Sequence, residues 1–219
     1  MGMAYDWSIG RVKLSCSEYK LCLIFVFKDT PHLKYLQILF ENRKRGDIGN
    51  DCLLSVDGTD CRLAMKCTDK FHSYKFKKAA ARYEVALCIR TGDICWWHGP
   101  FEAGMWNDNM IFQSALAHML EEGERVEADA GYKHSAPRYV KCPKIVTSET
   151  DPEKIRLQGR VRTRHETVNK RLKQFKVLKK PFRGTLIQHQ KCFAAVVALT
   201  QLCFENGEPL FPVEYQDNY

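Results

Sequence analysis

Three stretches in the first half of this 219-residue chain have the short apolar patterns of β-strands. They are Leu53–Asp60, Arg82–Ile89 and Ile94–Trp97. Between the second and the third stands Thr91-Gly92-Asp93, a sequence typical of a hairpin turn. The pattern predicts a small antiparallel meander that ends at Gly99-Pro100.

Four other stretches carry apolar residues at the three- and four-residue spacing of amphipathic helices. They are residues 32–42, 107–121, 161–175 and 185–205. A capping box of Thr185 and Gln188 opens the last of them. Either Asn107 or Asp108 can cap the second. The stretch Ser17–Phe27 fits a helix or a buried strand.

A short strand that begins at Arg125 repeats a feature of Leu53–Asp60, because both end in an aspartate with a glycine close behind. A buried strand excludes a carboxylate unless a backbone donor, a basic side chain or a metal ion pairs with it. A capped turn explains one such aspartate equally well. Asp57 and Asp129 are therefore candidates for a functional site. Residues 133–159, which follow, predict a long loop.

The composition limits the class of protein. A content of 45% hydrophobic and 27% charged residues is typical of an ordinary soluble chain with one main domain. The ten cysteines contain no Cys-x-x-Cys pair and no zinc-finger spacing, which predicts free thiols in a reducing compartment. No apolar run is long enough to span a bilayer. We therefore expect a soluble intracellular protein.

The formal net charge of +8 is concentrated in one segment. Between Arg160 and Arg183 there are ten Lys or Arg residues and one acid, so this segment carries +9 and the remainder about −1. Such a stripe indicates a polyanion partner such as nucleic acid, whereas a diffuse basic surface is usually only solvated. Lys66–Lys78 interleaves lysines with aromatic residues, which suits nucleic-acid contacts and equally suits an amphipathic edge strand.

Glu166 is the only acid in that basic segment. On a helix it lies one turn from Arg162 and Lys170, so it can belong to an ordinary surface ladder of i,i+4 pairs. It can equally be a metal ligand surrounded by cations that bind phosphate.

Four motifs in a fixed order give the chain a specific resemblance. They are Val56-Asp57-Gly58-Thr59; Gly99-Pro100 with Asp108 and Phe112; Glu127-Ala128-Asp129-Ala130-Gly131-Tyr132; and Arg164-His165-Glu166-Thr167-Val168-Asn169 with Leu172-Lys173 and Phe175. Residues 47–209 closely resemble the DDE superfamily endonucleases, the Harbinger-type transposases and their bacterial insertion-sequence relatives. In two departures, Ala79-Ala80-Ala81 stands where relatives usually carry a glycine-containing turn, and Ala130 replaces a more usual polar residue.

The resemblance implies an α/β protein with an RNase H-like fold. Helices flank a mixed central sheet, in which the antiparallel meander is joined by parallel strands. It also implies three parts: an N-terminal helical or irregular segment at residues 1–46, an RNase H-like DDE catalytic domain at residues 47–209, and a C-terminal tail at residues 210–219.

The resemblance further implies three catalytic carboxylates, Asp57, Asp129 and Glu166, that bind two Mg²⁺ or Mn²⁺ ions. Two such ions, about 3.5–4 Å apart, activate the attacking water or 3′-OH and stabilise the leaving oxygen of a phosphodiester. Hard cations take oxygen ligands, so carboxylates suit them. Without metal, three converging carboxylates raise one another's pKa values. Asp57 is expected to bridge both ions.

Arg162, Lys170 and Lys173 are candidate contacts to DNA phosphates beside this site. The expected function is metal-dependent DNA endonuclease or transposase activity, with phosphodiester cleavage and strand transfer, in the nucleus or elsewhere inside the cell. The expected partners are double-stranded DNA, a separate DNA-binding protein and further copies of the chain, with no membrane. The alternative is a domesticated or truncated transposase derivative that acts as a non-catalytic DNA-binding or protein-interaction module.

Overall fold

The computed structural model describes residues 7–9, 12–14, 31–44, 52–136, 138–141 and 152–213. The strands are β1 (Trp7–Ile9), β2 (Val12–Leu14), β3 (Cys52–Arg62), β4 (His72–Ser73), β5 (Lys78–Cys88), β6 (Ile94–Glu102), β7 (Arg125–Glu127) and β8 (Val140–Lys141). The helices are α2 (Pro31–Glu41), α3 (Asp108–Ser114), α4 (Pro152–Leu172), α5 (Lys176–Lys179) and α6 (Leu186–Glu205). The 3₁₀ turns are η1 (Asn42–Lys44), η2 (Asp69–Phe71), η3 (Leu116–His118) and η4 (Ala130–Ser135). The element predicted at Ser17–Phe27 lies outside the described residues.

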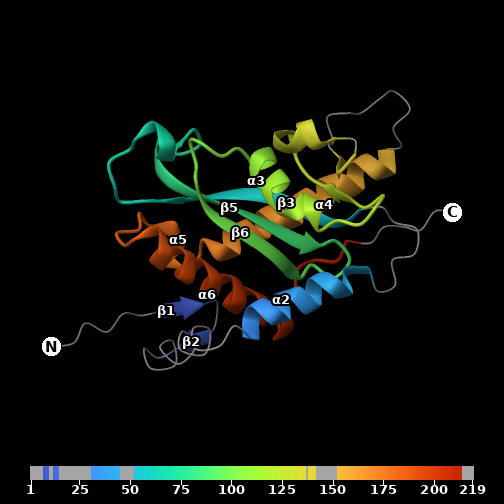
Figure 1. The fold of residues 1–219 in the computed structure, drawn as a ribbon. Coiled ribbons are helices and arrows are strands. Elements are labelled where there is room, and N and C mark those ends of the chain that lie inside the picture. The colour runs from blue at the N-terminus through green and yellow to red at the C-terminus, as the bar shows by residue number, and fades with distance from the viewer. Residues whose placement is uncertain are drawn as a thin grey trace.

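A mixed sheet with the strand order β4-β5-β3-β7-β8 forms the centre of the molecule, and β6 pairs with β5 (Figure 1). The pairs β3–β5 and β5–β6 are antiparallel, which is the predicted meander. From β3 the sheet continues through β7 and β8 in parallel pairs. The chain is therefore α/β with a mixed sheet flanked by helices, as expected for an RNase H-like fold.

Helices cover both faces of this sheet, and the alternation of side chains along β3 supplies both faces with core residues. On one face α4, α5 and α6 pack against apolar side chains of β5 such as Val85 and Leu87 (Figure 1). On the other face α3 and η4 pack against Leu54 and Val56. Asp57 therefore faces α4.

The predicted N-terminal helix is confirmed as α2, and it is fixed to the sheet. Leu36 and Phe40 are buried in the core. Arg43, just beyond the helix, donates from Nε to Glu124 Oε1 at 2.7 Å and from Nη2 to Glu124 Oε2 at 2.8 Å. Because both partners are buried, removal of either one would leave an uncompensated charge in the interior.

The meander is longer than the sequence pattern predicts, and Gly99-Pro100 does not end it. β6 runs through these residues to Glu102, because they lie at a register shift of the β5–β6 pair, where a proline costs no ladder hydrogen bond. β5 begins at Lys78, so Ala79-Ala80-Ala81 forms buried strand and not a turn.

Two other predicted boundaries were wrong. The helix predicted at residues 107–121 stops at Ser114, because Ala115 has non-helical backbone angles, and η3 follows it. The loop predicted at residues 133–159 contains the end of η4, the strand β8 and the first turns of α4. The early start of α4 at Pro152 fits the preference of proline for the first position of a helix.

The sequence correctly predicted the start of α6 and the state of the described cysteines. Thr185 accepts from the backbone N–H of Gln188 in a complete capping box. Six of the described cysteines have free thiols: Cys61, Cys67, Cys88, Cys95, Cys192 and Cys203. In the part of the chain that the structure describes, no helix has the length and apolar character to cross a membrane.

Candidate catalytic site

The strand register brings Asp57 and Asp129 to the same level of the sheet. Ser55 of β3 lies beside Glu127 of β7 in a parallel pair. Asp57 and Asp129 each follow two residues later in the same chain direction, Asp57 within β3 and Asp129 beyond the end of β7. The parallel pairing therefore brings both residues to the same region of the sheet.

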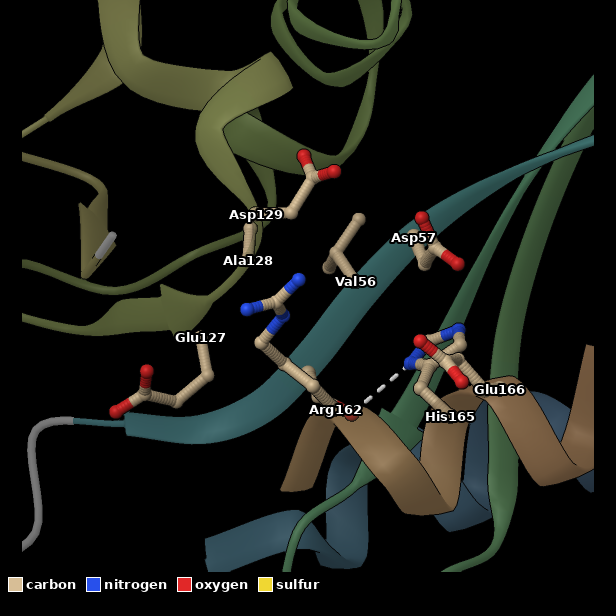
Figure 2. A pocket seen from close by; sticks show the side chains of 9 residues that line it. Val56, Asp57, Glu127, Ala128, Asp129, Arg162, His165 and Glu166 are labelled. Carbon is tan, nitrogen blue, oxygen red and sulfur yellow. Dashed lines mark hydrogen bonds between the residues drawn. The ribbon is translucent and has the colours of Figure 1, made fainter. Parts of the chain in front are cut away.

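Helix α4 adds the third predicted acid to the same place. One pocket is lined by Asp57, Asp129 and Glu166, together with Ser55, Arg162 and His165 among others. Figure 2 shows Asp57 and Glu166 on one side of this pocket and Asp129 on the other. The structure thus brings together three acids that come from a central strand, a strand end and a helix.

The three carboxylates do not converge on one point. Asp129 Oδ1 accepts a hydrogen bond from the backbone N–H of Gly131 at 2.7 Å and thereby caps η4. Asp57 Oδ2 accepts from Asn169 Nδ2 at 2.8 Å. Across the described residues, no group of three or more His, Cys, Asp or Glu side chains is close enough to hold a metal ion. To share an ion, these acids have to move closer together.

Asp108 is a fourth carboxylate, and it explains the glycines that follow two of the acids. Asn107 caps α3 by accepting from the backbone N–H of Met110 at 2.9 Å, so Asp108 is not the cap. A Cβ atom at Gly58 would overlap Asp108 Oδ1, and one at Gly131 would lie 2.9 Å from Asp129 Oδ1 and 3.1 Å from Asp108 Oδ2. Gly58 therefore makes room for Asp108, and Gly131 makes room for both Asp129 and Asp108.

Arg82 supports Asp108 from the neighbouring strand. Its Nε and Nη2 donate to the two oxygens of Asp60 at 2.7 and 3.1 Å. Its Nη1 lies 3.6 Å from Asp108 Oδ1 and donates to the carbonyl of Trp106. One guanidinium therefore links β3, β5 and the start of α3 beside the pocket.

The electrostatics of the pocket oppose ionisation of Asp57. Burial, followed by the charges of Asp129 and Asp108, raises the pKa of Asp57 to about 7. Burial also raises the pKa of Glu84, which pairs with Gly58 in the sheet, to about 8. A bound cation would favour the ionised form of Asp57. The oxygen donors of the pocket therefore suit a hard cation such as Mg²⁺ or Mn²⁺, provided that they close around it.

His165 and Asn169 contact β3, and the sequence analysis predicted no role for either residue. They lie four residues apart on the face of α4 that meets β3. His165 Nδ1 is 3.1 Å from Ser55 Oγ, and burial lowers the pKa of His165 to about 3, so the ring is neutral. The i,i+4 spacing is the signal that could have identified both, once the partner of this helix face was known.

The three predicted phosphate contacts lie in different surroundings. Arg162 is exposed and lines the pocket. Lys170 is exposed about two turns further along α4. Lys173 is half-buried, with its Nζ 5.7 Å from the centroid of the Phe76 ring. Only Arg162 of these three predicted contacts is part of the pocket wall.

Comparison with known proteins gives one match. A family model described as "DDE superfamily endonuclease" matches residues 56–203, a span that holds Asp57, Asp129 and Glu166. No curated protein and no solved structure matches the chain.

Replacement of Asp57 by Asn should stabilise the metal-free protein, because the fold holds this carboxyl group at a raised pKa. Below about pH 3, Asp57 is mostly protonated in both the folded and the unfolded chain, so the variant and the wild type should be equally stable. From there to about pH 7 only the unfolded Asp57 ionises, and wild-type stability falls. Urea unfolding in EDTA should show a gain of roughly 1–3 kcal/mol for Asp57→Asn at pH 8. Equal stability of the two proteins at pH 8 would contradict the raised pKa.

Proposed function

This chain belongs to the DDE superfamily endonucleases, and from that premise we propose that it cleaves DNA phosphodiester bonds with divalent metal ions held by Asp57, Asp129 and Glu166. The family supports a nuclease or transposase-type activity for the domain. For these three residues the proposal rests on their common pocket. They come from three separate elements, and the fold nevertheless brings them to one place.

The proposed roles of the acids rest on their common pocket and on the family to which the chain belongs. Two Mg²⁺ or Mn²⁺ ions would activate the attacking water or 3′-OH and stabilise the leaving oxygen. Asp57, on the central strand, would hold these ions together with Asp129 and Glu166. With a water as nucleophile the reaction is cleavage, and with a 3′-OH it is strand transfer.

Three other residues of α4 shape the surroundings of these acids. Asn169 donates to Asp57 Oδ2 and so fixes the direction of that carboxylate. The neutral His165 fills the space between α4 and Ser55 without adding a charge that would repel a cation. Arg162 lines the pocket with a permanent positive charge, which suits the phosphate that approaches the acids.

DNA is the proposed substrate, and Arg162, Lys170 and Lys173 are the proposed phosphate contacts. A separate DNA-binding protein, self-association of the chain and a nuclear location stay predictions. A non-catalytic DNA-binding module is the second candidate, because the acids do not converge on one point among the described residues.

Loss of any one of the three acids should abolish cleavage. In a nicking assay on supercoiled duplex DNA with Mg²⁺ or Mn²⁺, Asp57→Asn, Asp129→Asn and Glu166→Gln should each reduce the rate by about a hundredfold or more, because each removes a metal ligand. Glu122→Gln makes the same chemical change on an exposed side chain outside the pocket and should retain wild-type activity. Full activity of Asp57→Asn would sink the assignment, and an inactive wild type would favour the non-catalytic module.

The salt dependence of DNA binding tests the basic contacts. Arg162→Gln and Lys170→Gln should each weaken duplex binding and lower the slope of log affinity against log salt concentration by about 0.9, since each loses one phosphate contact. Fluorescence anisotropy over a range of salt concentrations measures this slope. Lys34→Gln, on the exposed face of α2, is the matched control and should leave it unchanged. Slopes equal to the wild type in both variants would show that these side chains are merely solvated.

A further inference from the structure

The turn between β4 and β5 carries an aromatic ring that the fold leaves uncovered. Tyr74 is 72% exposed, more than any other large apolar side chain that the structure describes. The neighbouring aromatic residues are accounted for by packing, because Phe71 packs against the core and Phe76 is half-buried. The rings of Tyr74 and His72 form an edge-to-face pair with their centroids 5.3 Å apart. Lys77 Nζ lies 5.8 Å from the centroid of the Tyr74 ring.

Positive charge surrounds this ring. Five lysines and one acidic residue lie in the segment 66–78. On the inner side of the turn, the ring of Phe76 lies between two cations, with Arg62 Cζ 5.9 Å and Lys173 Nζ 5.7 Å from its centroid. The basic segment before β5 therefore lies next to the basic C-terminal end of α4.

Hydrogen bonds fix the turn to the strand that carries Asp57. Ser73 Oγ donates to Asp60 Oδ2 at 2.6 Å and accepts from the backbone N–H of Phe76 at 3.2 Å. The backbone N–H of Lys77, a residue with a positive φ of 52°, donates to the carbonyl of Ser73 at 2.8 Å. Asp60 follows Asp57 by three residues on β3, a distance of about 10 Å. The turn is thus held in a set position near the pocket.

The charge of this turn also reaches the pocket. Burial and the charges of Asp129 and Asp108 raise the pKa of Asp57, and the charge of Lys75 opposes that rise. Burial lowers the pKa of Lys173, and among the charged neighbours Lys75 adds to the effect. Lys75 therefore lies within electrostatic range of both the pocket and the end of α4.

An exposed aromatic ring flanked by lysines matches one kind of ligand in particular. The ring stacks on a base, and the ammonium groups bind the adjacent phosphates. In a duplex each base is already stacked between its neighbours and cannot reach a protein ring unless it is extruded. The feature therefore selects an unpaired nucleotide over a paired one.

We propose that Tyr74, together with Lys75 and Lys77, binds an unpaired nucleotide of the DNA substrate next to the phosphodiester that enters the pocket. This inference rests on the proposed function, because the bound strand is the one presented to Asp57. It assigns to the β4–β5 turn a preference for DNA with a melted or single-stranded segment beside the cut.

Fluorescence anisotropy in EDTA, where metal-dependent cleavage is blocked, tests the preference. The probes are a blunt duplex and the same duplex with a short unpaired tail. Tyr74→Ala should weaken binding of the tailed duplex by roughly 5- to 150-fold, the effect of one lost stacking contact, and should leave the blunt duplex within about twofold. Tyr74→Phe should bind like the wild type. Lys75→Gln and Lys77→Gln should each lower the salt slope for the tail by about 0.7.

The control variant is Phe211→Ala, which removes another exposed aromatic ring outside the turn. It should bind both probes like the wild type. Unchanged binding of the tailed duplex by Tyr74→Ala, or an equal loss for both probes, would overturn the proposal. A loss confined to the tailed duplex supports it even if the nicking assay shows no cleavage, so the two proposals fail separately.

Discussion

The burial of Asp57 among other carboxylates is the constraint on which the surrounding structure depends. Its carboxyl group lies on the central strand, and its pKa is raised to about 7 by burial and by Asp129 and Asp108. Several polar contacts surround this buried group and its acidic neighbours. Asn169 donates to Asp57, and Arg82 provides positive charge between Asp60 and Asp108. The pocket therefore stores an unfavourable electrostatic free energy that a cation would relieve.

The cations of this region lie on its exposed side. Asp57 and Asp129 come from β3 and from the end of β7, whereas Arg162, Lys170 and the acid Glu166 are exposed on α4, and Lys75 is exposed on the turn before β5. A negative pocket beneath a positive rim suits a substrate whose phosphates need cations on the outside and metal ions at the reacting centre. The same separation explains how a protein of net charge +8 keeps an acidic site.

The sequence predicted the elements whose signals are local, and it missed those that depend on contacts across the sheet. The strand Leu53–Asp60 and the capping box at Thr185 were predicted because apolar runs and caps are short-range patterns. The continuation of β6 through Gly99-Pro100 was missed, since a bulge opposite β5 decides it.

The same distinction holds in the site. The common pocket of the three acids followed from a resemblance, which carries tertiary information that periodicity lacks. The role of Asp108 did not follow, because the overlap with Gly58 and Gly131 exists only when α3 lies on the sheet. A glycine close behind an aspartate indicates that another group approaches the backbone there, but the sequence pattern does not identify that group as Asp108.

The anomalous difference density of crystals soaked in Mn²⁺ tests the central claim most directly, because it locates the metal independently of activity. We predict peaks between Asp57, Asp129 and Glu166. Manganese bound only at other sites, with no anomalous density beside Asp57, would contradict the assignment of this pocket as the catalytic centre.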